Sequence, residues 1–225
     1  MNKIISINNL CISFKNTEVL NRVNLNIIKG RTTAIVGESG SGKTLTALSI
    51  LKLLPSNAKI TSGEIYFENK NLLSETDQFI QKIRGNKIST IFQEPMTSLN
   101  PLHTINKQIE EIIITHNKIS YEKVKNKTKD LLKEVGLTEL SERPKVYPYE
   151  LSGGQRQRVM IAMSIANKPD VLIADEPTTA LDVTIQMQIL ELLSSLQKKL
   201  GMTLLFISHD LSVVKKISDF VYVMK

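Results

Sequence analysis

Short apolar segments alternate with helical patterns along most of this sequence. Four of these segments are rich in β-branched and aliphatic residues and are predicted to be strands, at residues 32–36, 89–92, 171–174 and 203–207. Because each is apolar throughout, rather than at every second position, the four are typical of a parallel sheet that is covered on both faces. The pattern therefore predicts an α/β fold with a mostly parallel core.

Helical patterns occupy the intervals between these strands. A helix is predicted at residues 45–54, where Pro55 would end it. A second apolar stripe runs from Ile185 to Leu200, and Gly201 is a natural terminator for that helix. Strand and helix thus follow one another as an α/β sheet requires.

The remaining segments define the expected domain organisation. The first 30 residues and residues 63–67 predict a small antiparallel β subdomain. Residues 94–166 are mostly helical in pattern, most clearly at 109–115, 121–135 and 155–166. We therefore expect one unit over residues 1–225, in which residues 1–93 and 167–225 form the core with the antiparallel subdomain and residues 94–166 form a helical subdomain.

The composition is that of an ordinary globular protein, with 225 residues of which 41% are hydrophobic and 23% charged. No stretch approaches the ~18 consecutive apolar residues of a membrane span, and the first residues do not resemble a signal peptide. The single cysteine, Cys11, excludes an internal disulfide, fits a reducing compartment and is expected to pack in the core. These features predict an intracellular chain or a peripheral subunit of a larger assembly.

The net charge of +7 invites a nucleic-acid or anionic-membrane interpretation. Only six of the 29 basic residues are arginines, however, and lysine, asparagine and isoleucine are abundant. The densest basic stretch, residues 121–133, has no interleaved aromatic cluster on which bases could stack. We interpret it as a solvated helix face and expect no nucleic acid as a partner.

A glycine-rich sequence joins one predicted strand to the helix that follows it. It comprises Gly37, Glu38, Ser39, Gly40, Ser41, Gly42, Lys43 and Thr44. This is the GxxxxGK[ST] pattern in the strand-to-helix context that a phosphate-binding loop requires. Backbone N–H groups and the helix N-terminus would bind the phosphates. Lys43 would reach the β- and γ-phosphates, and the Thr44 hydroxyl would bind Mg²⁺.

Two adjacent carboxylates, Asp175 and Glu176, follow another predicted strand. Open α/β sheets bind ligands at the carboxyl ends of their strands. Asp175 would therefore hold the metal, and Glu176 would polarise an attacking water. A turn before Pro177 would explain one carboxylate, but it explains the pair poorly.

The segment Leu151, Ser152, Gly153, Gly154 and Gln155 resembles the signature of ATP-binding-cassette (ABC) ATPases, and it lies about 20 residues before Asp175, as in that family. Other residues match further motifs of the family. Phe14 matches the aromatic residue that stacks on adenine, and Gln93 matches the Q-loop. Ala180, Leu181 and Asp182 match the D-loop, and His209 matches the switch histidine. The resemblance covers essentially all 225 residues. His103 and His116 match no such motif and are expected to be structural.

The resemblance implies an ATPase that uses ATP and Mg²⁺. Gln93 would sense the γ-phosphate and join Thr44 and Asp175 at the metal, Glu176 would be the general base, and His209 would stabilise the transition state. In this family two cassettes, identical or different, hold two nucleotides between them head to tail. Ser152, Gly153, Gly154 and Gln155 would then contact the nucleotide of the other cassette. A plain helix cap is the alternative for this segment taken alone.

A finer resemblance concerns transport. Residues 93–105 look like the peptide and nickel importer ATPases, and residues 46–55 are similar to the amino-terminal half of fused two-cassette, microcin-type uptake ATPases. This resemblance implies a peripheral subunit on the cytoplasmic face of the bacterial inner membrane. It would drive membrane-spanning permease subunits, with a solute-binding protein as an indirect partner, and the helical subdomain would contact the permease.

The chain stops at Lys225, whereas members of the family continue with a hairpin and a long C-terminal region. We expect either half of a split two-cassette protein or a decayed copy. Two other functional classes stay open, a cassette that acts on DNA or ribosomes without transport and an inactive, truncated cassette. The importer-like segment argues against the first, and intact Glu176 and His209 argue against the second.

Overall fold

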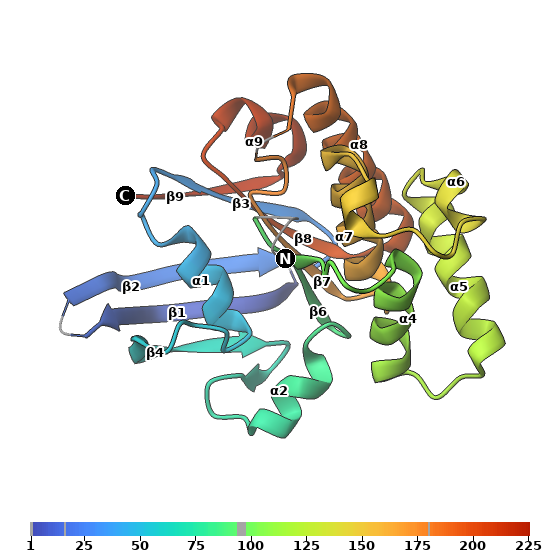
Figure 1. Ribbon diagram of the computed structural model, residues 1–225. Helices are drawn as coiled ribbons and strands as arrows, with labels where there is room; N and C mark the ends of the chain where they lie inside the picture. The colour runs from blue at the N-terminus through green and yellow to red at the C-terminus, as the bar shows by residue number, and fades with distance from the viewer. Residues whose placement is uncertain (1, 16, 94–97, 180) are drawn as a thin grey trace.

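Two β-sheets and a group of helices make up the computed structural model, which describes residues 2–15, 17–93, 98–179 and 181–225. One sheet has five strands in the order β6-β7-β8-β3-β9, and the other has four in the order β2-β1-β4-β5. Figure 1 shows helices α4 to α7 gathered at the right, away from strands β1, β2 and β4 at the left.

The five-stranded sheet is parallel throughout. Its strands are β3 (Thr32–Gly37), β6 (Ile88–Ile91), β7 (Val171–Asp175), β8 (Thr203–Ser208) and β9 (Phe220–Met224). All residues of β7 and β8 are buried, which is why their sequences are apolar without alternation. The predicted parallel α/β core is therefore confirmed, although Phe92 lies just beyond β6 rather than within it.

The four-stranded sheet is antiparallel. It consists of β1 (Lys3–Phe14), β2 (Thr17–Ile28), β4 (Ala58–Phe67) and the short β5 (Lys70–Asn71). Strand β1 pairs with β2 on one side and with β4 on the other. The antiparallel β element expected from the sequence is thus present, and Cys11 is buried in it, as expected.

Four helices accompany the strands of the core, namely α1 (Lys43–Ile50), α2 (Asp77–Ile83), α8 (Val183–Leu200) and α9 (Leu211–Ile217). Gly201 ends α8 with a φ of 63°, in the left-handed region, as predicted. The prediction for α1 was wrong at both ends, because the helix begins at Lys43 and stops at Ile50. Lys52 has a φ of 51°, which no helix continues through, and the Arg84 guanidinium donates hydrogen bonds to the carbonyls of Leu51 and Lys52.

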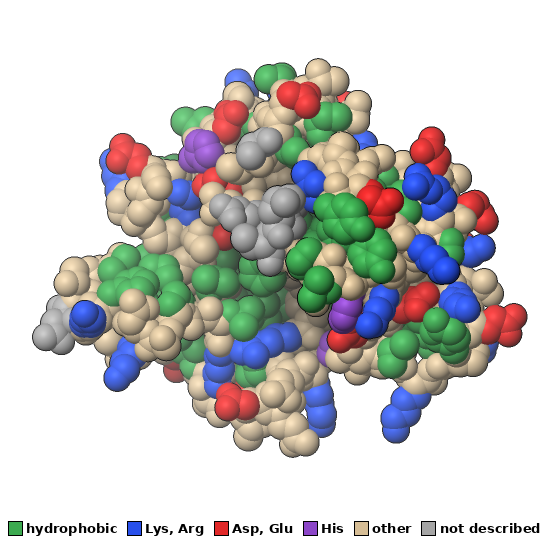
Figure 2. Space-filling model, in the orientation of Figure 1, with side chains coloured by type: hydrophobic (Ala, Val, Ile, Leu, Met, Phe, Trp, Pro, Cys, Tyr) green, Lys and Arg blue, Asp and Glu red, His purple; other side chains and the backbone are tan. Residues whose placement is uncertain are grey.

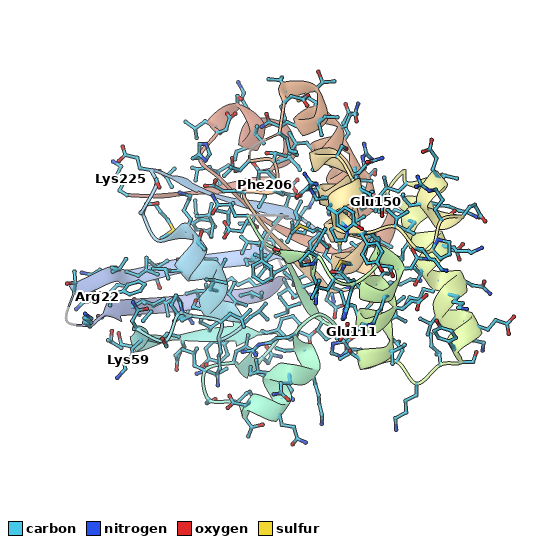
Figure 3. The ribbon with its side chains drawn as sticks, viewed as in Figure 1. Arg22, Lys59, Glu111, Glu150, Phe206 and Lys225 are labelled. Carbon is cyan, nitrogen blue, oxygen red and sulfur yellow. The ribbon has the colours of Figure 1, made fainter. Side chains whose placement is uncertain are left out.

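The segment between β6 and β7 is helical. It contains α4 (Ile105–His116), α5 (Tyr121–Glu134), α6 (Thr138–Ser141), the 3₁₀ segment η1 (Pro148–Glu150) and α7 (Gly153–Ile165). In Figure 3, Glu111 lies on α4 and Glu150 directly before α7. None of the described helices has both the length and the apolar character needed to cross a membrane.

Two clusters of buried side chains hold these layers together. The antiparallel sheet and α1 pack on one face of the parallel sheet, and α8 and the helical segment pack on the other. Successive residues of β3 alternate between them, since Ala34 belongs to the helical side and Ile35 to the antiparallel side. Phe206 of β8 is fully buried at the centre of the molecule (Figure 3).

Candidate active site

The predicted catalytic residues follow three neighbouring strands of the parallel sheet. The glycine-rich loop follows β3, Asp175 and Glu176 stand at the end of β7, and His209 comes directly after β8. Strand β8 lies between β7 and β3. Because parallel strands end at one edge of a sheet, the three segments meet there.

The glycine-rich loop is shaped by close packing as well as by turns. Gly42, which precedes α1, has a φ of 90°, and a Cβ at this position would overlap the side chain of Leu20 on β2. A turn earlier in the loop is closed by a hydrogen bond of 3.2 Å from the N–H of Ser41 to the carbonyl of Glu38. Only glycine combines this backbone conformation with so close a neighbour.

The side chain of Lys43 turns back into the glycine-rich loop. Its Nζ donates hydrogen bonds of 2.9 and 2.8 Å to the carbonyls of Gly37 and Glu38, and the residue is only 5% exposed. An ammonium group has three N–H donors. The loop therefore uses two donors to fix the position of the charge and leaves one for a ligand.

Thr44 and Asp175, which are predicted to hold one metal between them, lie side by side. The Thr44 hydroxyl donates to Oδ1 of Asp175 at 3.3 Å. Burial raises the pKa of Asp175 above its usual range, and the hydrogen bond from Thr44 acts in the opposite direction. The described residues contain no group of three His, Cys, Asp or Glu side chains that could hold a metal by themselves. One carboxylate and one hydroxyl suit Mg²⁺, which takes oxygen ligands and completes its shell with water and substrate phosphates.

The carboxylate of Glu176 receives side chains from three directions. Gln93 Nε2 donates to its Oε2 at 3.2 Å, and the Thr179 hydroxyl donates to the same oxygen at 3.0 Å. His209 Nδ1 lies 3.2 Å from Oε1. The structure therefore brings the three predicted catalytic side chains together. Thr179 was missed by the sequence analysis, because a threonine after Glu-Pro-Thr has no periodicity or spacing of its own.

A cavity of about 180 Å³ lies between these groups. Its lining comprises Ser39, Gly40, Gly42, Lys43, Thr44, Leu45, Gln93 and Glu176. The phosphate-binding loop and the two side chains from the other strands thus face one shared space. This arrangement can accept a phosphate chain on one wall and a polarised water on the other.

The signature segment is placed elsewhere, at the start of α7. Ser152 Oγ accepts from the N–H of Gln155 at 3.3 Å, and the Gln155 side chain accepts from the N–H of Ser152 at 2.9 Å. This is a reciprocal capping box. A Cβ on Gly154 would lie 2.8 Å from Cγ2 of Ile185, so α7 and α8 approach closely here. Neither the serine nor the two glycines line the cavity.

Two other predicted residues also stand apart from the cavity. Phe14 ends β1 and is partly buried against the antiparallel side of the core. Asp182 caps α8, its Oδ1 accepting from the N–H of Ile185 at 3.0 Å. Ala180, which shares its predicted motif, lies outside the described residues.

A second cavity, of about 240 Å³, lies between the end of β6 and helices α4 and α7, and we call it the α4–α7 cavity. Apolar side chains of Phe92, Ile112, Met160 and Met163 contribute to its lining, together with the His116 ring. Figure 2 shows hydrophobic side chains reaching the surface where the helices meet the sheets. The sequence analysis missed this cavity, although the two methionines stand three positions apart on α7.

Comparison with known proteins gives consistent matches. The ABC transporter family matches residues 20–179 of this chain. The peptidoglycan transport ATP-binding protein YejF of Agrobacterium fabrum is 52% identical over 98% of the chain, and the oligopeptide transport ATP-binding protein OppD of Bacillus subtilis is 48% identical over 99%. The chain spans 41% of the length of the first and 63% of the second.

Solved structures match over nearly the full chain. The dimeric, post-hydrolysis structure of the ATP-binding cassette MJ0796 bound to ADP and phosphate has a TM-score of 0.86 and 33% identity, and the match covers 98% of this chain and 94% of that one. A cbiO1 subunit from Clostridium perfringens, part of the transporter complex cbiONQ, has a TM-score of 0.85 and 30% identity, with coverage of 100% and 86%.

Proposed function

This chain belongs to the ABC transporter family, and we propose that it is the ATP-hydrolysing subunit of an importer for peptides or a related small solute. The contacts around Glu176 carry this proposal, because they join a carboxylate, an amide and an imidazole beside a phosphate-binding loop. The names of the relatives, which include oligopeptide and dipeptide transport proteins, support the choice of solute.

The phosphate-binding loop would hold the triphosphate. The free N–H donor of Lys43 would bind a phosphate oxygen, and the backbone N–H groups at the start of α1 would bind others. Phe14 would stack on the adenine ring from the end of β1. Since Lys43 is already fixed by two carbonyls, little side-chain entropy is lost when the nucleotide binds.

Thr44, Asp175 and Gln93 would hold Mg²⁺ together with the phosphates. When bound, the ion would neutralise charge that develops on the phosphate oxygens. The raised pKa of Asp175 is consistent with a buried carboxylate that gains from a nearby cation.

Glu176 would act as the general base. One proton of the attacking water would pass to its carboxylate as the water oxygen forms a bond to the γ-phosphorus. The bond from that phosphorus to the β–γ bridging oxygen would break, and ADP would leave with the electron pair. A positioned base of this kind contributes about 10²–10⁴-fold. His209 would stabilise the transition state from the other side of the carboxylate.

A second cassette would complete the site. Ser152, Gly153, Gly154 and Gln155 would present the N-terminus of α7 to the nucleotide held by the partner, with Asp182 nearby at the start of α8. Ser152 and Gln155 already cap that helix, and the remaining N–H groups of its first turn are free to bind an anion. The dimeric MJ0796 structure supports this assembly.

The α4–α7 cavity would receive an apolar side chain of a permease subunit. Phe92 lines the cavity and directly precedes Gln93, which contacts Glu176. A permease that presses on Phe92 would therefore act on Glu176 through a single intervening residue, Gln93. In such a transporter the chain would lie on the cytoplasmic face of the inner membrane, and a solute-binding protein would be an indirect partner.

Two measurements on the Glu176→Gln variant test the proposed function. Phosphate release should fall by about 10²–10⁴-fold against the unaltered chain while nucleotide binding is retained. The solution mass of the variant, measured by light scattering, should double on addition of Mg-ATP. Substantial turnover by the variant would overturn the role of Glu176, and a monomer that binds Mg-ATP would overturn self-assembly of the composite site.

A further inference from the structure

Glu176 occupies an unusual backbone position at the end of β7. Its φ is 46°, in the left-handed region that a glutamate rarely adopts. Its N–H donates to the carbonyl of Ile207 at 3.0 Å, and its own carbonyl accepts from the N–H of Thr179 at 3.1 Å. The second bond closes a turn from Glu176 to Thr179. The turn brings the threonine back beside the carboxylate that it follows.

The side chains at the two ends of this turn are also bonded. The Thr179 hydroxyl donates to Oε2 of Glu176 at 3.0 Å, and Gln93 Nε2 donates to the same oxygen at 3.2 Å. A carboxylate oxygen offers two lone-pair positions. Both positions on Oε2 are therefore occupied.

The other carboxylate oxygen of Glu176, Oε1, still has a free acceptor position. Oε1 has one side-chain contact among the described residues, with Nδ1 of His209 at 3.2 Å. One of the roughly four acceptor positions of the carboxylate then remains, and it is on Oε1. The side chain of Glu176 is only 14% exposed, so few directions of approach are open to a water.

We propose that Thr179 is a positioning residue for Glu176, and that it and Gln93 leave Oε1 as the atom that accepts the proton of the attacking water. This proposal rests on the proposed role of Glu176 as general base. In the step, the water O–H bond breaks and its proton binds Oε1 as the water oxygen forms its bond to the γ-phosphorus. The bond from that phosphorus to the β–γ bridging oxygen breaks, and ADP leaves with the electron pair. Without the hydroxyl of Thr179, the carboxylate can turn and offer either oxygen, so fewer encounters are productive.

The neighbouring threonine cannot take over this role. Thr178 is buried, and its hydroxyl accepts a hydrogen bond of 3.4 Å from Gln186 Nε2. Thr179, by contrast, is exposed. Its hydroxyl is therefore not required for core packing, and its removal should leave the fold intact.

The test compares Thr179→Val, which keeps the shape and removes the hydroxyl, with Thr179→Ser, which keeps the hydroxyl. Phosphate release is measured over a range of Mg-ATP concentrations for both variants, the unaltered chain and Glu176→Gln. Thr184→Val, the same change on the exposed first turn of α8, is the matched control. Urea unfolding of each variant checks that the fold is retained.

We expect kcat of Thr179→Val to fall about tenfold, as for loss of one hydrogen bond to a charged group, with KM within about twofold of the unaltered chain. Thr179→Ser and Thr184→Val should keep kcat within about twofold. An unchanged kcat in Thr179→Val, or an equal loss in Thr179→Ser, would overturn the proposal for Thr179. Retained turnover in Glu176→Gln would instead overturn the proposed function.

Discussion

His209 Nδ1 lies 3.2 Å from Oε1 of Glu176, although the two residues follow different strands and are far apart in the sequence. The imidazole is 60% exposed and the carboxylate 14% exposed, so the contact joins a solvent-facing ring to an enclosed carboxylate. Residues that touch in this way act as a unit, and the effects of changing them are not independent.

We therefore predict that the effects of His209→Ala and Glu176→Gln on kcat do not multiply. His209→Ala should lower kcat by about 10–10²-fold, and the double variant should be close to Glu176→Gln alone. Steady-state phosphate release by the three variants measures this. His103→Ala is the control, because His103 is half-buried beside Lys107 of α4, away from the cavity, and the variant should keep the original rate. Losses that multiply would show that the two residues act separately.

The two glycines of the signature should differ in their tolerance of alanine. A Cβ on Gly153 would lie 3.7 Å from Leu181, an ordinary contact, whereas a Cβ on Gly154 would lie 2.8 Å from Cγ2 of Ile185. That methyl group is on a stiff, β-branched side chain. Gly154→Ala should cost about 1–3 kcal/mol of unfolding free energy by overpacking. Gly153→Ala should be neutral or stabilising by up to about 1 kcal/mol.

Urea unfolding of the two variants measures this difference. Adding Ile185→Leu to Gly154→Ala removes the branched methyl group and should recover part of the loss. Equal midpoints for the two alanine variants would contradict the close approach of α7 and α8.

Replacing Asp175 should stabilise the fold in a pH-dependent way. Burial raises the pKa of Asp175, so the ionised carboxylate costs stability in the folded state. That cost is present at neutral pH and disappears as the pH is lowered until the carboxyl is protonated in both states. Asp175→Asn should therefore have the higher Tm at neutral pH, and its advantage should shrink in acid.

Thermal unfolding at several pH values tests the predicted direction of the Tm difference between Asp175→Asn and the unaltered chain. Asn keeps an acceptor oxygen for the Thr44 hydroxyl, so the neighbouring hydrogen bond is preserved. Asp130→Asn, on the exposed side of α5, is the control and should change Tm little at any pH. A lower Tm for Asp175→Asn at neutral pH would contradict the prediction.

Arg84 should contribute to the stability of the segment after α1. Its guanidinium donates at 2.8 and 3.0 Å to the carbonyls of Leu51 and Lys52, where the helix has ended. Arg84→Met keeps the aliphatic stem and removes both donors, and we expect a loss of about 1–3 kcal/mol. Chemical denaturation measures it, with Arg22→Met at an exposed position of β2 as the control. Equal losses of unfolding free energy in the two variants would show that the two Arg84 hydrogen bonds do not contribute to stability.

The parallel core could be predicted because burial on both faces leaves a direct trace in the sequence. Strands β7 and β8 have no exposed residue, and their segments were identified from continuous apolar character. The helix after Lys43 was predicted less well. Its end depends on Lys52 in a left-handed conformation and on Arg84, which lies on a distant segment, so no local pattern reveals it.

The candidate site also has some parts that could be predicted from the sequence and others that could not. The phosphate-binding loop and the Asp175–Glu176 pair are recognisable from their residue patterns and follow predicted strands, and Thr44 and Asp175, which are in contact, were expected to share a metal. The contacts of Glu176 with His209 and Thr179 were not, because they depend on how side chains turn after the strands end. The α4–α7 cavity was missed for a related reason, since a cavity is formed by what several segments leave unfilled.

Strand β8 separates β7 from β3 in the parallel sheet, and this order has a consequence for synthesis. Thr44 and Asp175 are 131 residues apart, an interval that takes a ribosome roughly 7 to 26 s at about 5–20 residues per second. The phosphate-binding loop therefore leaves the ribosome well before Asp175 and Glu176, and β8 is synthesised later still. A nascent chain released before β8 would contain both the lysine and the two carboxylates, yet it would lack the strand that lies between β3 and β7 in the sheet.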